Sequence, residues 1–266
     1  GNPTNSINTY IAGREIGEIW GFETVGIAKT DDEMQAHLNK VGGQSAIGSG
    51  VWTAGDIMYA DQDGKPGITK GAQTLEDHGD LKVIGNNTPR YHFGLDLNAN
   101  YKGFDVRLFF QGVMKRDYWQ GSNIFWGVGQ WGMKEHEDYF RDEPVGLAGH
   151  EIAANVNSYY ARPRFDSTQN QETQTRYLQD ASYIRLKNFQ LGYTLPASMI
   201  RKIGITNCRI FVSGENLWTG TKLSKLFDPE TISGGNTDSN ASAPIKSAGN
   251  AYPLSRTWSF GLSVSL

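Results

Sequence analysis

Two aspartates, Asp61 and Asp63, are separated by one residue and followed by Gly64, which is the start of a calcium-loop pattern. Ca²⁺ takes about six to eight oxygen ligands, and its loops place aspartates at alternating positions. Other aspartates near in the sequence would complete such a shell, namely Asp56, Asp77 and Asp80. Lys65 stands where a third carboxylate would help, and a turn rich in aspartate and glycine has the same composition. The spacing therefore predicts a structural calcium site at Asp61 and Asp63 or a simple turn.

The stretch from Lys115 to Tyr160 is rich in aromatic residues. Flat rings with polar neighbours suit stacking on sugars, because a ring offers a large apolar contact and, in Trp and Tyr, a polar group. The same rings are equally suited to pack the stretch against itself or against a partner protein. Long loops on a rigid scaffold often carry function, so we expect contact with a ligand or partner. The candidate ligand-binding residues are Trp119, Trp126, Trp131, Tyr139, Tyr159 and Tyr160.

Acidic residues in the same stretch raise the question of catalysis. They are Glu135, Glu137, Asp138, Asp142 and Glu143. A glycosidase needs two carboxylates held several Å apart, but a run of charges on a loop is more often a solvated face. The 5 histidines show no metal-ligand spacing, and there is neither a P-loop nor a nucleophile elbow. We therefore predict no enzymatic activity, no catalytic residue, and no cofactor other than the structural calcium.

The elements that would position these groups are strands. From Trp258 to Leu266 large apolar and small residues alternate without exception, so the apolar side chains share one face of a strand. The pattern recurs in Tyr91–Tyr101, Phe104–Val113, Tyr183–Leu195 and Arg209–Trp218. Each band has about the 9–11 residues that a tilted strand needs to cross a bilayer, with apolar side chains toward lipid and polar ones toward the lumen.

The polar face of these strands carries charges, among them Asp96 and Arg107, which a packed core would not tolerate unpaired. The predicted lumen-facing residues are Asp96, Asn98, Arg107, Gln111, Asn188 and Gln190. Arg185 and Lys187 lie four and two residues before Phe189, so strict alternation would place them on its apolar face. Their charges predict that the apolar band ends there and that the strand continues into water.

The connections between the strands alternate in length. Lys102-Gly103 is a tight turn, and 197–207 is a modest connection with a helical turn around Ser198–Lys202. By contrast, the connections 115–174 and 219–253 are very long. Short turns on one side and long loops on the other are typical of outer-membrane barrels, which predicts extracellular long loops and a periplasmic C-terminus.

Composition excludes some other functions. The net charge of −3 gives no sign of a basic surface that would bind nucleic acid. The sequence contains no run of 18 apolar residues, so no transmembrane helix is predicted. The chain opens with polar residues rather than a signal peptide, so we expect a mature or shortened piece. Five strands do not close a barrel, because open edges in lipid are costly. Residues 90–266 are therefore predicted to be the five C-terminal strands of a larger barrel, unless the other strands come from another chain.

Residues 1–89 are predicted to form a mostly extracellular region with its own short elements. We expect strands in Ile16–Ile27 and Val51–Tyr59 and a helix over Asp31–Val41, N-capped by Thr30 or Asp31.

The run Tyr183–Pro196 resembles the "YIRLKNLTLGYTLP" block of the SusC/RagA-type TonB-linked outer-membrane proteins. Further blocks resemble that family in the same order: Ile84–Pro89, Tyr101–Gly112, Arg209–Leu217, Asp228–Glu230 and Tyr252–Gly261. The resemblance implies a TonB-dependent importer of oligosaccharides or peptides in the outer membrane of Bacteroidetes. Its all-β barrel would have about 22 strands around an N-terminal plug.

The resemblance also implies partners. They are a SusD-like surface lipoprotein above the barrel and TonB, which would contact the region N-terminal to this chain. The alternative from the residues alone is a soluble secreted carbohydrate-binding β-sandwich protein, and a weaker one is a surface glycosidase.

Overall fold

The computed structural model describes residues 2–48, 50–120, 123–127, 132–165, 167–232 and 252–266. These residues divide into two compact units. Unit 1 holds residues 2–88 and 118–178, and unit 2 holds residues 89–117, 179–232 and 252–266. The predicted region 1–89 thus forms one unit together with most of the predicted loop 115–174. Most of the predicted loop 219–253 lies outside the described residues.

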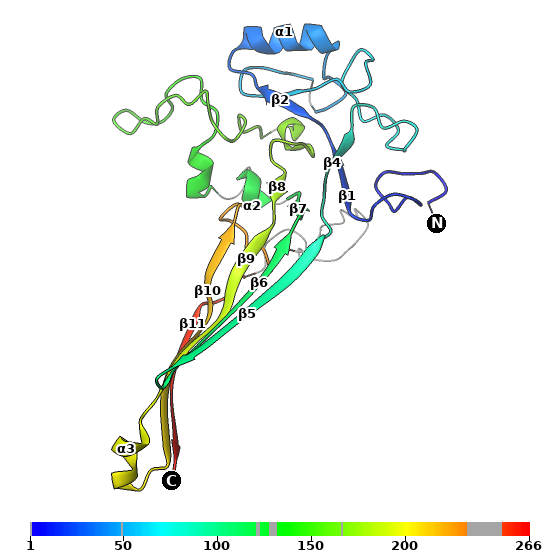
Figure 1. Cartoon of the computed structure of the whole chain (residues 1–266). Helices are drawn as coiled ribbons and strands as arrows, with labels where there is room; N and C mark the ends of the chain where they lie inside the picture. Colours follow the sequence, from blue (N-terminus) through cyan, green and yellow to red (C-terminus); the bar gives the residue numbers. More distant parts are fainter. Residues whose placement is uncertain (1, 49, 121–122, 128–131, 166, 233–251) are drawn as a thin grey trace. The chain divides into compact units, whose positions relative to one another are not determined.

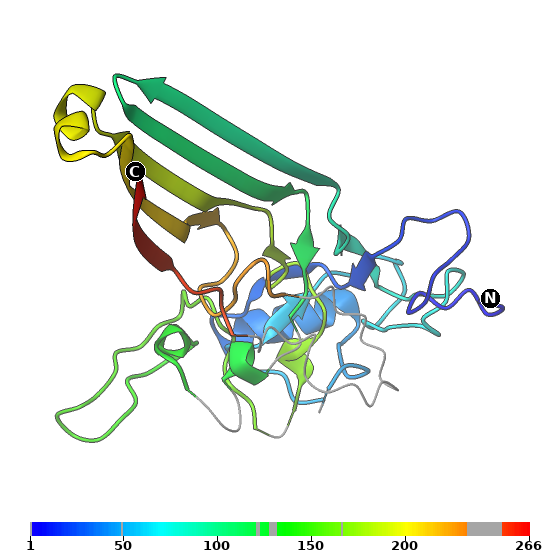
Figure 2. The ribbon, with the colours of Figure 1, turned by 90° about the horizontal axis from the view of Figure 1, so that it is seen from below.

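Unit 2 is built on one antiparallel sheet of five strands (Figures 1 and 2). The strands are β5 (Tyr91–Tyr101), β6 (Phe104–Met114), β9 (Tyr183–Thr194), β10 (Asn207–Thr221) and β11 (Thr257–Ser265). Their order across the sheet is β11-β10-β9-β6-β5. The five strands predicted from alternation are therefore confirmed, and so is the all-β, antiparallel fold class.

Short connections gather at one end of this sheet. Lys102 and Gly103 join β5 to β6, and their φ values of 48° and 88° are those of a type I′ turn. The helices α3 (Ala197–Ile200) and η3 (Arg201–Ile203) join β9 to β10, as the sequence predicted. The C-terminus lies at the same end as α3 (Figure 1). The long connections therefore leave from the opposite end.

One face of the sheet exposes its apolar side chains. On β11, Phe260 and Leu262 are 84% and 65% exposed, and they pair with Val212 and Ile210 of β10. Exposed apolar side chains occur on the other strands too, including Leu95, Leu97, Phe104, Leu191 and Trp218. The alternative β-sandwich would bury this face under a second sheet, whereas the structure leaves it exposed.

A β-bulge changes which face the first residues of β9 occupy. Asn188 pairs with Phe109, but Leu186 pairs with Phe110, so Lys187 is an extra residue in the strand. One extra residue reverses the faces of all residues before it. The prediction that Arg185 continues the apolar side into water was wrong, because Arg185 pairs with Gln111 on the polar face and is buried.

The N-terminal part of unit 1 holds two short antiparallel ladders and the helix α1 (Asp31–Val41). Strand β1 (Glu18–Gly21) pairs with β4 (Lys82–Asn86), and β2 (Thr24–Ile27) pairs with β3 (Ile57–Tyr59). Helix α1 (Asp31–Val41) has the predicted bounds. The Oγ1 of its N-cap Thr30 accepts a hydrogen bond of 3.1 Å from the backbone N–H of Glu33.

Some features of unit 1 differ from expectation. The predicted strand Ile16–Ile27 is divided between β1 and β2, and only the end of Val51–Tyr59 is a strand, because Gly55 turns the chain with a φ of 89°. Strand β4 was not predicted. The remaining elements are short: β7 (Asp117–Tyr118), α2 (Asn123–Trp126), η1 (Lys134–Glu137), η2 (Gln169–Gln171) and β8 (Gln179–Asp180).

The core of unit 1 joins sequence-distant segments. Phe22, Ile57 and Tyr59 are fully buried. The Tyr59 hydroxyl donates to the carbonyl of Gln169 at 2.7 Å, and the backbone of Phe22 bonds to Thr173 and Thr175. Residues 167–175 are thereby held against β2 and β3. Throughout the described residues, no helix combines the length and apolar character needed to cross a membrane.

Candidate functional site

The six predicted lumen residues lie on one face of the five-stranded sheet. Arg107 pairs with Asn98 on one side and with Gln190 on the other. One step further along the strands, Phe109 pairs with Asp96 and Asn188, and Gln111 lies two residues beyond Phe109 on the same face. That this face borders a lumen stays a prediction, but the strand register brings its residues together as expected.

Charges on this face are paired across strands. Arg107 donates through Nη2 and Nε to the carboxylate of Asp96, at 2.6 and 3.2 Å. Asn98 donates to the same carboxylate at 3.1 Å. Both members of the ion pair are well exposed, so its contribution to stability is about 0–1 kcal/mol. The pair orients the side chains rather than holding the sheet together.

A second ion pair crosses a whole strand. Arg209 of β10 reaches over β9 to Asp105 of β6, with Nε 3.0 Å from Oδ1. The residue beneath is Gly192, and a Cβ there would lie 2.4 Å from the Arg209 guanidinium and 2.5 Å from the Asp105 carboxylate. The absence of a side chain at Gly192 therefore leaves room for this contact, and a Cβ there would push the two charged groups aside.

A buried charge cluster anchors the segment Asp228–Ile232 to unit 2. Arg185 donates to the Asp228 carboxylate and to the Thr219 hydroxyl, both at 2.8 Å. Lys187 donates to Glu230 at 2.9 Å. Only 3% of the Arg185 side chain is exposed. Sequence analysis missed this cluster, since the bulge that brings Arg185 to the polar face has no clear sequence signal.

In unit 1, four of the predicted aromatic residues, Trp119, Trp126, Tyr159 and Tyr160, belong to a ring cluster around Phe125, which is fully buried. Tyr159 and Tyr160 have ring centroids 4.9 Å apart, and Trp126 lies 4.9 Å from Tyr177. Trp119 joins the cluster at 6.3 Å from Trp126. Trp131 lies outside the described residues. Most of these rings therefore pack against one another, as the packing interpretation expects.

Tyr177 is a member of the cluster that the sequence did not single out. Its hydroxyl accepts a hydrogen bond of 2.8 Å from the backbone N–H of Ala161. Burial raises the pKa of Tyr177 to about 12, because the phenolate is poorly solvated among the rings. The Tyr177 side chain is therefore held in its neutral, protonated form within the cluster.

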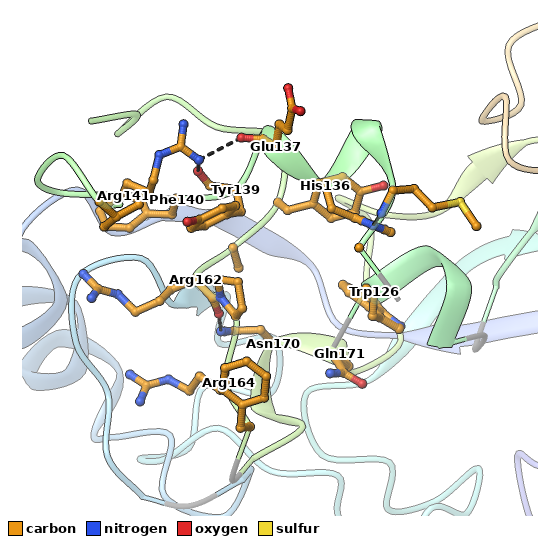
Figure 3. A pocket seen from close by; sticks show the side chains of 18 of the residues that line it. Trp126, His136, Glu137, Tyr139, Phe140, Arg141, Arg162, Arg164, Asn170 and Gln171 are labelled. Carbon is orange, nitrogen blue, oxygen red and sulfur yellow. Dashed lines mark hydrogen bonds between the residues drawn. The ribbon is translucent and has the colours of Figure 1, made fainter. Parts of the chain in front are cut away.

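A cavity of about 890 Å³ opens beside this cluster (Figure 3). Of the predicted ligand-binding residues, Trp126, Tyr139 and Tyr160 line it, whereas Trp119 and Tyr159 do not. Its size suits a small solute or one part of a larger one. Three arginines that the sequence analysis overlooked also line it, namely Arg141, Arg162 and Arg164. Ligand binding by these residues stays a prediction.

Two of the acidic residues of this region, Asp138 and Asp142, and His136 have structural partners. Asp142 accepts a hydrogen bond from Arg162, which lowers the pKa of its carboxyl group. Asp138 accepts from the side chain of Asn155 at 2.8 Å. The two ring nitrogens of His136 are engaged by the backbone N–H of Met133 and the carbonyl of Phe125. The histidine thus orients the loop.

Three aspartates of unit 1 come together at the predicted calcium loop. The carboxylate oxygens of Asp61, Asp63 and Asp80 lie within 4.8 Å of one another, and Asp80 is buried. The Lys65 ammonium lies 3.1 Å from the Asp63 carboxylate and, with the Lys65 backbone N–H, lowers the pKa of Asp63. Three carboxylates supply only part of a calcium shell. The calcium site therefore stays a prediction, with Asp80 as its third ligand.

Asp56 and Asp77 do not belong to this group. The fully buried carboxylate of Asp56 is bound by Arg164 through Nε at 2.7 Å and by Asn170 at 2.8 Å. Asp77 accepts from the backbone N–H of Ala72 at 3.1 Å. Of the three additional ligands considered from sequence, the structure brings Asp80 to Asp61 and Asp63.

The two-sided antiparallel sheet defines the class: an all-β protein whose strands carry an apolar and a charged face, as membrane barrels do. TonB-dependent receptor P3 of Formosa agariphila is 28% identical to this chain over 252 residues, 95% of the chain. TonB-dependent receptor P26 of the same organism is 28% identical over 231 residues, 81% of the chain. The resemblance to TonB-linked outer-membrane proteins is thus confirmed.

The chain spans 22% of the length of each of these relatives. No protein-family model matches it. Among solved structures, the RagAB peptide transporter has a TM-score of 0.49 at 20% identity, covering 93% of this chain and 22% of that one. The RagAB peptide importer in its closed-closed state has a TM-score of 0.48 at 20% identity, covering 97% and 25%.

Proposed function

We propose that this chain is part of a TonB-dependent importer in the outer membrane and that the five-stranded sheet of unit 2 belongs to its barrel wall. The observation that carries the proposal is the exposed apolar face that spans all five strands, opposite a face of paired charges. In water such a face would be an aggregation hazard. Against hydrocarbon it is the expected surface of a spanning strand.

The edges of the sheet support a larger assembly. Strands β11 and β5 are its outermost strands, and each offers unpaired backbone groups on one side. An open edge in lipid costs several kcal/mol for each unsatisfied group. Further strands, supplied outside this chain, would close the barrel around a plug. The relatives are long enough to supply them, because this chain covers about a fifth of their length.

In this proposal the long connections and unit 1 are extracellular, and the end of the sheet with α3 and the C-terminus is periplasmic. A SusD-like lipoprotein would cover the extracellular side, and TonB would act through the region N-terminal to this chain. The solute is an oligosaccharide or a peptide. The chain would bind and pass this solute without converting it, and the aromatic cavity of unit 1 would contact it.

Cysteine labelling in whole cells tests the orientation. In the full-length protein with Cys208→Ser, single cysteines at Leu147 and Met199 would report the two sides, since both side chains are highly exposed. A membrane-impermeant maleimide should label Leu147→Cys in intact cells and Met199→Cys only after the outer membrane is disrupted. Equal labelling in intact cells, or recovery of the protein in the soluble fraction, would contradict the proposal. Uptake of solute that stops when TonB is deleted would test the import step.

A further inference from the structure

The wall of the unit 1 cavity carries more basic than acidic side chains. Among the described lining residues the basic side chains are Lys134, Arg141, Arg162 and Arg164, and the acidic ones are Glu137 and Asp142. Figure 3 shows the guanidinium groups of the three arginines extending to the same side of the cavity, one above another. This side of the cavity therefore concentrates positive charge.

Arg141 is buried, with 7% of its surface exposed. Its Nε donates to the carbonyl of Ala153 at 2.9 Å, and Nη1 donates to the carbonyls of Glu137 and Tyr139 at 2.7 and 3.2 Å. Among the described residues no carboxylate pairs with Arg141, and Nη2 has no acceptor. A buried cation is normally paired with an anion, because burial without one is costly.

The neighbouring arginines differ in how firmly they are paired. Arg164 is bound to the fully buried Asp56, and its own side chain is 15% exposed, so an anion in the cavity would have to displace a buried carboxylate to bind it. Arg162 is bound to Asp142 with the two side chains 34% and 50% exposed, so an incoming anion can compete for it. The Arg162 guanidinium lies over the Phe140 ring at 5.2 Å, and Arg141 lies over the Tyr139 ring at 4.4 Å. Two consecutive rings therefore hold two arginines in place.

We infer that this cavity binds an anionic group of the imported solute, a carboxylate, through Arg141 and Arg162. This inference rests on the proposed function and specifies its substrate class. A guanidinium offers several N–H donors in a fixed plane and suits a carboxylate better than a hydroxyl. The uncompensated charge of Arg141 provides the attraction, and the exposed pair of Arg162 provides the second, exchangeable contact.

The opposite side of the cavity suits an uncharged part of the same solute. Trp126 and Gln171 face the arginine side across the cavity (Figure 3). An indole ring and a primary amide would contact a sugar ring or a peptide equally well. The carboxylate is therefore the chemistry that the site selects, and it can come from an acidic sugar or from a peptide.

Calorimetric titration of the full-length protein in detergent micelles tests the inference. The probes are trigalacturonate, with galactotriose as its uncharged counterpart, and the peptide Ala-Phe-Glu, with the C-terminally amidated Ala-Phe-Gln as its counterpart. At least one carboxylate probe should bind about tenfold or more tightly than its counterpart, and binding should weaken as salt is added. Which probe binds identifies the source of the carboxylate.

Substitutions of the two members of the Arg162–Asp142 pair should change the affinity for carboxylates in opposite directions. Arg162→Gln should weaken carboxylate binding about tenfold or more, and Asp142→Asn should strengthen it, because the competing acid is gone. Arg14→Gln is the matched control, since Arg14 also pairs with an acid and a ring in unit 1 but does not line the cavity. Because Arg141 also ties three carbonyls, Arg141→Lys, which keeps the charge, accompanies Arg141→Gln.

Two outcomes would overturn the inference: both counterparts bind as tightly as their carboxylate probes, or neither carboxylate probe binds. Equal effects of Arg162→Gln and Arg14→Gln would also overturn it. None of these results would contradict the proposed import function. That function is tested separately, by the labelling pattern at Leu147 and Met199 and by TonB-dependent uptake.

Discussion

An arginine placed on the apolar face of β11 should destabilise the barrel strongly. Leu262 pairs with Ile210 and is 65% exposed, and it lies one residue from Gly261, the middle of the strand. A strand rises about 3.4 Å per residue and is tilted about 45°, so Leu262 lies roughly 2 Å from the depth of the strand's middle. At this depth Leu262→Arg should cost about 2–4 kcal/mol.

The matched control is Ser259→Arg, on the opposite face of the same strand. Ser259 pairs with Ser213 on the polar face, so an arginine there meets polar neighbours rather than lipid. The assay is reversible denaturant titration of the full-length barrel in lipid vesicles. The Leu262→Arg folding equilibrium should fall roughly 30- to 900-fold relative to wild type, and that of Ser259→Arg by far less. Equal losses for both variants would refute the assignment of this face to lipid.

Three more predictions concern other parts of the chain. Gly192→Ala should lower the free energy of unfolding in vesicles by about 1–3 kcal/mol, because its Cβ would displace Arg209, whereas an unchanged midpoint would show that the pair can move aside. If the aspartate cluster binds calcium, Ca²⁺ should raise the melting temperature of the wild type, and Asp61→Asn should reduce that shift; no shift in the wild type would leave the turn interpretation. Because burial raises the folded-state pKa of Tyr177 from 10.0 to about 12, its contribution to stability should be fully present below pH 10 and be lost as pH rises toward 12; denaturant titration at each pH should show a smaller loss for Tyr177→Phe.

The strands and the helix of this protein were predictable because their patterns are local. Alternation over Tyr91–Tyr101 identifies a strand with two chemically different faces, and the Lys102-Gly103 turn identifies its hairpin partner. The helix Asp31–Val41 follows from the Thr30 cap and the acidic first turn. In each case the signal lies within a few residues of the element it specifies.

The cavity and its arginines were not predictable in the same way. The aromatic stretch indicated a ligand region, but Arg162 and Arg164 reach the cavity from residues that follow it, and their acceptors Ala54 and Asp56 lie more than a hundred residues earlier. Pairing between such distant segments depends on how unit 1 folds around Tyr59. No rule on residue spacing predicts this pairing.

The sequence by itself determined the all-β class, the positions of the five strands and which side of most strands is apolar, because side-chain alternation is a property of the extended backbone. Only the tertiary structure decided where the alternation breaks, since Lys187 is recognised as an extra residue from the pairing of β9 with β6. It also decided that Arg141 is buried with no carboxylate partner among the described residues, and that Asp80 joins Asp61 and Asp63. Burial and ion pairing depend on contacts between segments far apart in the chain, and the order of residues alone does not specify those contacts.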